Sequence, residues 1–435
     1  MRDHDEKNDS PGGDSLILFT NNLELTINIQ QLSAEINALS LISDASPPAV
    51  TRVLYTDTDL KGRSYVTQLA QEAGLQISTD AIGNIFMTWP GKNPQLIPVA
   101  TGSHTDAIPY SGKFDGVVGV LGAIEAIRAL KRQGYQPERT VEIIMFTAEE
   151  PTRFGMGCLG SRVLSGNLNS AQLLKLSDAN GDGFDDIRRG AGFQGDLAAV
   201  ALKRGCYKAF VELHIEQGPR LEQLGIDIGL VTDIAAPATV RVEIEGEGGH
   251  AGAVLMPHRK DALVGAAKIA LAVQDIASIS NSEHAVATTG KFEVFPGAVN
   301  SIPSRVTMEI DVRDTNLANR DDMLDKIIQS VHKIADVHKL KGSCQILNSD
   351  APAHCDDNLL ATIEDACMQH ALKFQPMISH AYHDALFMSL VCPTAMIFVP
   401  SEHGYSHRPE EYSSPVQIEK GVIVLAQVLA HLSGE

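Results

Sequence analysis

The chain has 435 residues, and its 35 basic and 54 acidic residues give a formal net charge of −19 at pH 7. Nucleic acids and anionic membranes both bind clustered positive charge, so this balance argues against either as a partner. The six cysteines are scattered without a C-x-x-C pair, which favours neither a disulfide framework nor a structural zinc cluster. One core rarely serves more than roughly 250–300 residues, so the length predicts more than one domain.

Residues 1–26 are expected to form a disordered leader, since they open with the polar run MRDHDEKNDSPGGDS. This run lacks the apolar centre of a signal peptide. No apolar run elsewhere in the sequence approaches the roughly 20 residues that a membrane-spanning helix needs. A cytoplasmic location is the expectation that follows if Met1 is the natural start.

Residues 27–234 alternate predicted helices with short apolar strands, among them 82–89 and 96–101. Asp115 is placed to cap a following helix, and Gly134 is placed to end it. That helix has its apolar residues on one face, at Val117, Val120, Leu121, Ile124, Ile127 and Leu130. The alternation predicts an α/β catalytic domain with a mostly parallel sheet and helices on both faces.

A histidine or a carboxylate closely follows each of four apolar, strand-like runs. The runs are IPVATGSHTDAI, VEIIMFTAEEP, FVELHIEQG and AMIFVPSEHGYSH, and a fifth element, KFDG, adds an aspartate soon after the first histidine. Ligands gather beyond the carboxyl ends of the strands in an open α/β sheet. This rule predicts that six side chains converge, namely His104, Asp115, Glu149, Glu150, His214 and His407.

A mixed set of histidines and carboxylates suits a pair of borderline divalent ions, and such a site most often activates water. The chain is therefore predicted to be a hydrolase. Each signal alone is weak, because an isolated His-x-Asp or Glu-Glu pair is most often solvated surface. His214 alone would be read as a hydrogen-bonded core histidine. The full set, in order and each after an apolar strand, makes coincidence improbable.

The segment 235–350 shows a different pattern, with four alternating strands and helices at 261–277 and 320–337. This pattern predicts a small, mainly antiparallel α+β module. The last segment, 351–435, returns to the first style and carries His407. The module is therefore predicted to be inserted into the catalytic domain. Helices are expected near 359–372 and 418–432, with a strand at 394–399 between them.

The acidic run SDANGDGFDDIRRG partly follows a calcium-loop pattern, in which Asp178 would be position 1. Position 12 of that pattern is Arg189, where a bidentate glutamate is required. Asp185 stands at position 8, where an apolar residue usually sits. We predict an exposed acidic turn at this place and no calcium site.

The chain resembles the metal-dependent aminoacylase and carboxypeptidase-like amidohydrolases, in the branch that contains N-carbamoyl-amino-acid hydrolases, allantoate amidohydrolases and ureidoglycolate amidohydrolases. The resemblance covers nearly all of residues 27–433. It rests on GSHTDAIPYSGKFDGVVGV, TAEEPTRFGMGCLGSR, LHIEQGPRLE, GGHAGAVLMPHRKDA, NSIPSRVTMEIDVRD, AYHDALF and GYSHRPEEYSS. Within the branch, AAPA, AYHDALFM and GYSHRPEEYSS look more like the ureidoglycolate group, since the carbamoylases usually have glycine where Tyr382 stands.

The resemblance implies two divalent metal ions per subunit, with Mn²⁺ favoured and Zn²⁺, Co²⁺ or Ni²⁺ open. Asp115 would bridge the two ions, and Glu149 would be the general base. Asp106 would accept the second ring N–H of His104 and fix its tautomer. The remaining implied metal ligands are His104, Glu150, His214 and His407.

The resemblance also implies that the inserted module acts as a lid and forms a homodimer. His250 of this module would stabilise the oxyanion, often in the partner subunit's site. Asn300 and Arg313 would hold the substrate carboxylate, although a turn residue and a surface ion pair are the alternatives for them. The other implied contacts are Gln217 to the ureido or amide group, His383 orienting the substrate or a metal ligand, and Tyr382, which narrows the pocket or packs in the core.

The implied reaction is hydrolysis of the ureido C–N bond of a small ureido-carboxylate, with ureidoglycolate giving glyoxylate, ammonia and CO2. An allantoate or N-carbamoyl-L-amino-acid hydrolase would use the same residues, and the pocket around Tyr382 would discriminate between them. A dipeptidase fits less well with TAEEPTRFG and HIEQG. A non-catalytic ligand-binding member is the remote alternative, and it predicts loss of the base or of ligands that are all present here.

Overall fold

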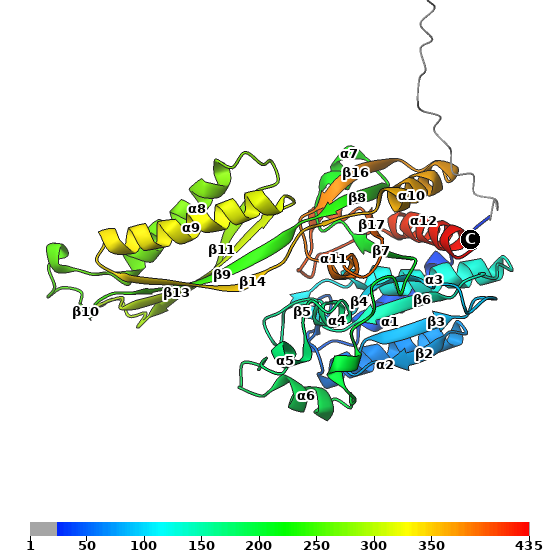
Figure 1. Cartoon of the computed structure of the whole chain (residues 1–435), viewed down its shortest axis with the longest axis horizontal. Helices are drawn as coiled ribbons and strands as arrows, with labels where there is room; N and C mark the ends of the chain where they lie inside the picture. Colours follow the sequence, from blue (N-terminus) through cyan, green and yellow to red (C-terminus); the bar gives the residue numbers. More distant parts are fainter. Residues whose placement is uncertain (1–23, 435) are drawn as a thin grey trace, which may run out of the picture.

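The computed structural model describes residues 24–434, so residues 1–23 of the expected leader lie outside the described part. Figure 1 shows a body that contains both ends of the described chain and an elongated arm that projects from it. The arm is formed by residues 236–349, while the segments before and after it belong to the body. The chain therefore leaves the body once and returns to it once.

One nine-stranded sheet runs through the body in the order β15-β8-β17-β7-β4-β6-β3-β2, and β16 also pairs with β8. Its strands are β2 (Gln76–Thr79), β3 (Ile85–Trp89), β4 (Val99–His104), β6 (Val141–Phe146), β7 (Ala209–Ile215), β8 (Ile228–Ile234), β15 (Ala353–His354), β16 (Phe374–Ser379) and β17 (Thr394–Val399). A separate antiparallel pair is formed by β1 (Val50–Arg52) and β5 (Ala107–Ser111).

The body sheet is mixed, and the predicted parallel pairing is found in its centre and in one further pair only. In its centre, β4 pairs in parallel with β6 and β7, and β17 pairs in parallel with β7. The pairs β2–β3, β3–β6, β8–β17 and β8–β15 are antiparallel, while β16 runs parallel to β8. Residues 80–84 join β2 to β3, which is too short for the crossover that a parallel pair requires.

The strand expected at 82–89 is shorter because a turn occupies its first residues. Asp80 Oδ1 accepts the N–H groups of Ile82 and Asn84 at 3.0 and 2.9 Å, and β3 begins only after this turn. Asn84 in turn accepts the N–H of Thr147 at 2.9 Å. The turn therefore supports the segment that follows β6.

Helices cover both faces of the body sheet, as alternate side chains of β7 show. Leu213 faces α3 (Val117–Arg132) and α12 (Pro415–Gly434), where a Cβ on Gly421 would lie only 2.9 Å from a Leu213 methyl group. Glu212 faces the opposite way and accepts the N–H of Ala385 in α11 (Asp384–Met388) at 2.9 Å. The body also contains α1 (Ile29–Ser40), α2 (Asp57–Glu72), α4 (Leu159–Leu164), α5 (Ser170–Leu173), α6 (Phe184–Gly190), α7 (Arg220–Leu224) and α10 (Asp357–Gln369).

The closing helix α12 corrects the expectation that no apolar run approaches the length of a membrane span. By length and composition its 20 residues would suffice. Of its most apolar 18-residue stretch, however, 67% is buried inside the body, where the helix packs against α3, α10, β17 and β7. A buried apolar helix of this kind is a core element of the α/β body.

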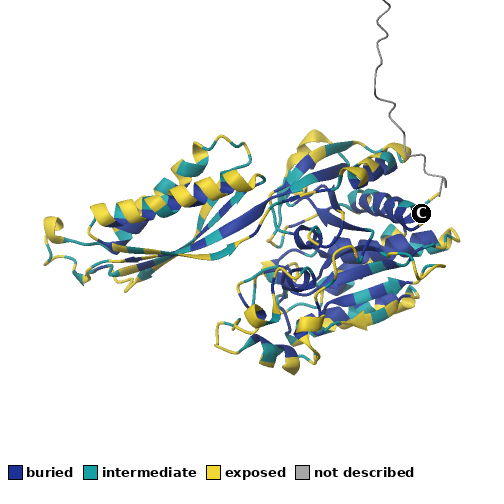
Figure 2. Cartoon of the chain, viewed as in Figure 1, coloured by how far each residue is buried: buried dark blue, intermediate teal, exposed yellow. Residues whose placement is uncertain are grey.

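The arm is an antiparallel sheet in the order β11-β13-β9-β14 with two long helices against one face. Along β9, the side chains of Val240, Val242 and Ile244 are buried, and they alternate with more exposed residues. The arm has a core of its own, separate from that of the body (Figure 2). Its main elements are β9 (Ala236–Glu245), α8 (Ala262–Ser278), β11 (Val286–Phe295), β13 (Arg305–Asp314), α9 (Leu317–Val337) and β14 (Lys341–Ser349).

The tip of the arm is a two-residue ladder between β10 (Gly249–His250) and β12 (Ser301–Ile302). Figure 1 shows β10 at the far end of the arm from the body. In the body, the acidic run forms a turn in which Asp178 Oδ1 accepts the N–H groups of Asn180 and Asp182. Arg153 lies 3.5 Å from Asp178 Oδ2, so this turn has protein partners for its carboxylate.

Candidate metal centre

The carboxyl ends of neighbouring strands deliver the predicted metal ligands to one place in the body. His104 is the last residue of β4, and His214 is the penultimate residue of its parallel neighbour β7. Glu150 follows β6, and His407 lies in the loop after β17. Asp115 lies in the loop that precedes α3. The order of the central strands therefore explains why residues 300 positions apart meet.

Two groups of three residues share the carboxylate of Asp115. The Nε2 atoms of His104 and His214 lie 3.7 and 3.1 Å from Asp115 Oδ1. We refer to these three residues as the inner triad. His407 Nε2 lies 3.2 Å from Asp115 Oδ2 and 3.4 Å from Glu150 Oε1, and these three form the outer triad. Each oxygen of Asp115 therefore faces a different triad.

The donor atoms of both triads fit divalent cations. Within each triad they lie within 4.8 Å of one another, close to the spacing of ligands that surround one ion at about 2.0–2.2 Å. Glu150 Oε1 is buried and has no hydrogen-bond partner among the described residues, which costs free energy unless a cation or solvent satisfies it. Burial and the nearby Asp115 raise the pKa of Glu150 to about 7. A cation at this place would reverse that shift.

Main-chain carbonyl groups orient both histidines of the inner triad. His214 Nδ1 lies 2.9 Å from the oxygen of Ile215, and His104 Nδ1 lies 3.1 Å from the oxygen of Asp106. The Nε2 atom of each ring is therefore left to face Asp115. The carboxylate of Asp106, the predicted partner of His104, lies farther away at 3.6 Å.

The carboxylate of Asp106 instead holds the loop that follows β6. Its Oδ1 accepts the N–H of Glu149 at 3.3 Å, and its Oδ2 accepts the N–H of Glu150 at 3.1 Å. The two adjacent glutamates then diverge. Glu150 faces His407 of the outer triad, whereas Glu149 Oε2 lies 3.7 Å from His104 Nε2. Glu150 therefore belongs to the outer triad, while Glu149 belongs to neither triad.

Glu149 is a carboxylate of the site that belongs to neither triad. The Cys158 thiol donates to its Oε1 at 3.5 Å. Burial raises the pKa of Glu149 well above its usual range, although the adjacent His104 opposes the shift. Glu150, Asp384 and Asp115 raise it further. Such crowding of buried acids is expected where bound cations supply the missing positive charge.

The loop before α3 differs from the prediction, because Asp115 does not cap that helix. The N-cap is Gly116, which has a φ of 64° and no side chain to donate or accept a bond. A Cβ at Gly116 would lie 2.4 Å from the His104 ring, so glycine is required there. Asp115 Oδ2 instead accepts hydrogen bonds from Gln217 Nε2 at 2.8 Å and Ser406 Oγ at 3.0 Å.

Glu411 is a support that the sequence analysis missed. Its Oε1 accepts the N–H groups of Phe114 and Asp115 at 2.8 and 3.1 Å, which fixes the position of Asp115. The only signal in the sequence is its position four residues after His407, in RPEEYSS. Sequence spacing alone could not show that this acid packs under a loop almost 300 residues earlier.

His383 lies beneath the inner triad and is buried. Its ring packs edge-on against that of His214, with centroids 4.5 Å apart, and its Nε2 lies 2.8 Å from Ser379 Oγ. Glu212, His214 and His383 form a third group with ligand-like spacing. The Glu212 carboxylate, however, already accepts bonds from Ser103 Oγ and the Ala385 N–H. This group therefore fits the role of support better than that of a third ion site.

The two triads open into a cavity of about 140 Å³, here named the metal cavity. Arg313 reaches it from β13 of the arm. Its lining comprises Asp115, Glu149, Glu150, Pro151, His214, Gln217, Arg313, Ala381, Tyr382 and His407. The arm and the body thus both contribute to the walls of the metal cavity.

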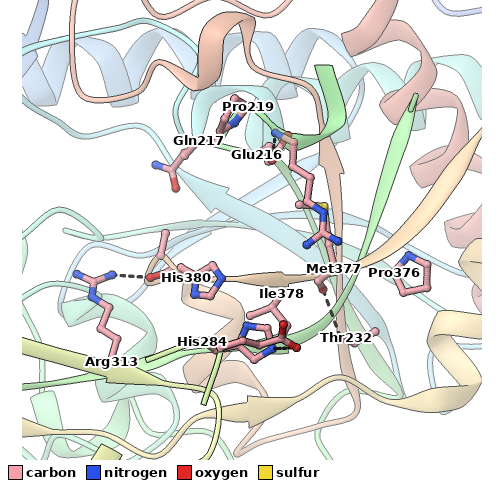
Figure 3. A pocket seen from close by; sticks show the side chains of 14 residues that line it. Glu216, Gln217, Pro219, Thr232, His284, Arg313, Pro376, Met377, Ile378 and His380 are labelled. Carbon is pink, nitrogen blue, oxygen red and sulfur yellow. Dashed lines mark hydrogen bonds and ion pairs between the residues drawn. The ribbon is translucent and has the colours of Figure 1, made fainter. Parts of the chain in front are cut away.

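A larger cavity of about 650 Å³ adjoins the metal cavity between the body and the arm, and the two share Gln217, Arg313 and Ala381. Figure 3 shows Arg313 directed at His380, whose carbonyl oxygen accepts its Nη1 at 2.7 Å. Arg313 also pairs with Asp311 at 2.7 Å. His284 of the arm lies beside His380 in this cavity, with ring centroids 5.7 Å apart.

Two predicted site residues are not brought to the metal centre by this chain. His250 and Asn300 are exposed at the tip of the arm, where the N–H of Ala251 donates to the oxygen of Asn300 at 2.9 Å. Neither residue lines the metal cavity or the cavity beside it. Figure 1 places β10, which contains His250, at the end of the arm away from the body.

Comparisons with known proteins find a matching family and similar chains. Residues 100–431 match the family described as Peptidase family M20/M25/M40. The chain is 53% identical to ureidoglycolate hydrolase of Arabidopsis thaliana, over 94% of this chain and 87% of that protein. It is 51% identical to ureidoglycolate hydrolase of Oryza sativa subsp. japonica, over 92% of this chain and 84% of that protein.

A solved structure is similar over nearly the whole chain. The crystal structure of AtUAH in complex with glyoxylate superposes with a TM-score of 0.90 at 52% sequence identity. The match covers 94% of this chain and 99% of that one. The fold of the described residues, arm included, is therefore that of a known group of hydrolases.

Proposed function

The chain belongs to the peptidase family M20/M25/M40, and on that basis we propose that it hydrolyses the ureido C–N bond of ureidoglycolate to give glyoxylate, ammonia and CO2. The observation that carries the proposal is the pair of triads that share Asp115, with Glu149 beside them as a free carboxylate. The choice of ureidoglycolate as the substrate follows the names of the two relatives, both ureidoglycolate hydrolases.

Two divalent ions are proposed as cofactors, with Mn²⁺ favoured and Zn²⁺, Co²⁺ or Ni²⁺ as alternatives. The inner triad would hold one ion and the outer triad the other, and Asp115 would bridge them. When bound, such ions polarise a carbonyl group and lower the pKa of water. The carbonyl oxygens that fix His104 and His214 keep both rings in the tautomer that a cation requires.

Glu149 is proposed as the general base. It lines the metal cavity, and its neighbour Glu150 is turned toward the outer triad. A carboxylate in that position can take a proton from water and return it to the leaving nitrogen. The N–H bonds to Asp106 hold both glutamates in place during this exchange.

Arg313 and Gln217 are proposed to bind the substrate. Arg313 can present a planar fork to a carboxylate, which a lysine cannot do. In the observed arrangement it reaches the metal cavity from the arm. Gln217 Nε2 donates to Asp115, so its carbonyl oxygen, buried and without a partner among the described residues, is free for an N–H of the ureido group.

We also propose that the protein is a homodimer formed through the arm. β11 is an edge strand of the arm sheet, and the apolar residues Phe295 and Val299 near its end are 55% and 103% exposed. An unpaired, apolar edge of this kind is suited to association. Dimerisation would also give His250 and Asn300 a site to act on, because the chain's own metal centre lies at the other end of the arm.

Tyr382 is proposed to limit the size of the substrate, because it lines the metal cavity of about 140 Å³. Ureidoglycolate is smaller than allantoate or most N-carbamoyl-L-amino acids. Hydrolysis of allantoate or of an N-carbamoyl-L-amino acid by the same residues is the alternative function.

The test is ammonia release by the Mn-loaded enzyme from ureidoglycolate, allantoate and several N-carbamoyl-L-amino acids, assayed in parallel. A kcat/KM for ureidoglycolate well above that for the other substrates is the expected result. Turnover of allantoate or a carbamoyl amino acid alone would keep the metal site and refute the substrate. No turnover of any of them would refute the proposed activity.

A further inference from the structure

Five polar side chains join the arm to the body at the place where the chain returns from β14. Asp350 lies in the connection between β14 and β15 and is 7% exposed. Around it gather side chains from α4 of the body, from α9 and β14 of the arm, and from the loop before α11. We call Arg162, Arg320, Asn348, Asp350 and Tyr382 the hinge cluster.

Two buried arginines hold Asp350 from the two parts of the molecule. Arg162 of the body donates from Nη1 to Asp350 Oδ1 at 2.8 Å and from Nη2 to Oδ2 at 2.6 Å. Arg320 of the arm donates to the main-chain oxygen of Asp350 and, at 3.0 Å, to Ser349 Oγ. Arg162 is 4% exposed and Arg320 is 2% exposed. A charge pair buried to this degree is costly to break, so it holds the hinge in one geometry.

The hydroxyl group of Tyr382 is saturated by this cluster. It donates to Asp350 Oδ2, and it accepts from Arg162 Nη2 and Asn348 Nδ2, both at 3.0 Å. A tyrosine hydroxyl offers one donor and accepts about two hydrogen bonds, so none remains for a substrate. The part of Tyr382 that the metal cavity can use is therefore its ring, which stacks on Phe387.

Arg162 also reaches the loop that carries the proposed base. Its Nε donates to the oxygen of Gly157 at 2.9 Å, and its Nη1 donates to Asn167 Oδ1 at 3.0 Å. With the bonds to Asp350 and Tyr382, five hydrogen bonds use the five N–H groups of the guanidinium. Gly157 precedes Cys158, whose thiol contacts Glu149. One side chain thus connects the hinge, the cavity wall and the base.

We propose that Asp350 and Arg162 are positioning residues that hold the Tyr382 ring in place as a wall of the metal cavity for one orientation of the arm. Substrate selection then depends on the hinge as well as on the cavity lining. A change of arm orientation moves Asn348 and Arg320, which belong to the arm, relative to Arg162, which belongs to the body. The inference rests on the proposed function only for the identity of the substrates.

The experiment compares the Mn-loaded wild type with Tyr382→Phe, Asp350→Asn and the double variant. Steady-state kinetics are measured with ureidoglycolate and allantoate, and amide hydrogen exchange is measured across 348–350 and 380–383. We expect each single variant to raise the KM for ureidoglycolate by about tenfold, the size of one lost hydrogen bond to a charged group, with kcat changed by less than about threefold. The preference for ureidoglycolate over allantoate should fall in parallel.

The KM of the double variant should be no higher than that of the single variant with the larger increase, because both substitutions break the same contact. Exchange should become faster in both segments together. Glu309→Gln is the matched control, since Glu309 pairs with Arg241 between two strands of the arm, away from the hinge cluster. This control should leave KM, substrate preference and exchange in the two segments at their wild-type values.

Wild-type KM and substrate preference in the Tyr382→Phe variant, with wild-type exchange, would overturn the proposal. If Asp350→Asn does not fold, Tyr382→Phe still tests the proposal, since it removes one hydroxyl group and keeps the ring. Additive effects in the double variant would also count against a shared contact. If the wild type does not hydrolyse ureidoglycolate, the proposed function fails, and exchange in the two segments alone supports or refutes the hinge cluster.

Discussion

The candidate metal centre in the body and the tip of the arm both carry residues that were predicted to form one site. In the structure these two groups of residues lie apart and differ in burial and in their hydrogen-bond partners. Side chains of the inner triad are at most 6% exposed, and main-chain or side-chain partners orient each of them. His250 and Asn300 at the tip are exposed, and they lie at the end of a two-helix arm away from that centre.

This difference shows which of the predicted site residues a single subunit brings together. The body positions its candidate ligands through neighbouring strands of one sheet, so their geometry is fixed when the sheet forms. The tip residues lie on or beside the short ladder of β10 and β12, and they line neither of the two cavities. Their proposed roles need a second subunit, whereas the metal triads need only a cation.

The largest expected effect is that of Glu149→Gln, which keeps the shape of the side chain and removes the base. Turnover should fall by about 10²–10⁴-fold, the usual contribution of a positioned general base. Both metals should remain bound, because Glu149 belongs to neither triad. Ammonia release and metal content are measured on the same preparation, with Glu138→Gln, an exposed partner of Lys92, as the control. Full activity with both ions bound would refute the assigned base.

The second prediction tests whether the tip acts on a partner. His250→Ala should lower kcat by about 10²–10³-fold if this histidine stabilises the oxyanion. Glu149→Gln and His250→Ala subunits, unfolded and refolded together, should then recover about a quarter of the wild-type activity, since half of the dimers are mixed and each has one intact site. No recovery on mixing would place the action of His250 within its own subunit or remove its role.

The third prediction concerns Asp106, whose carboxylate holds the loop that carries Glu149 and Glu150. Asp106→Asn should weaken metal binding by about 10–100-fold, a typical cost of losing a carboxylate that orients a metal site. The cause is the loss of an acceptor for the Glu149 or Glu150 N–H. Titration of the apo-protein with Mn²⁺ measures the change. An unchanged affinity would show that Asp106 does not help to position Glu150.

The smallest expected effect is a change in the pH dependence of stability at Asp80→Asn. Burial raises the pKa of Asp80 to about 6. A raised acid pKa means that the folded state binds more protons than the unfolded state between about pH 4 and 6. This contribution to stability is therefore full below about pH 4 and is lost as the pH rises through about 6.

Denaturant unfolding at pH 4.5 and pH 7 measures this effect. The change in unfolding free energy between the two pH values should differ between the variant and the wild type by on the order of 1–2 kcal/mol. Asp227→Asn is a useful contrast: burial opposes the shift, but the hydrogen bond from Lys420 still holds the pKa of Asp227 below its usual value. Its contribution to stability is lost only as the pH falls below about 4, so this variant should respond to the change from pH 4.5 to pH 7 as the wild type does. The same pH response in Asp80→Asn and the wild type would show that Asp80 does not titrate in this range.

Helix and strand periodicity predicted the elements well, including both arm helices, which are observed at Ala262–Ser278 and Leu317–Val337. Local signals are sufficient there because an amphipathic pattern depends on residues three or four positions apart. Pairing direction was not predictable in the same way. The antiparallel contact of β17 with β8 depends on which strand lies beside which, and that is decided by packing across the whole sheet.

The sequence by itself determined the types and the order of the candidate ligands, because a histidine or carboxylate after an apolar strand keeps its place when parallel strands assemble. Only the tertiary structure decided that Asp115 faces both triads instead of capping α3, since the close approach of Gly116 to His104 turns the chain there. Only the tertiary structure separated the arm tip from the metal centre and saturated the Tyr382 hydroxyl. Those features depend on contacts between residues far apart in the chain, which spacing along the sequence does not encode.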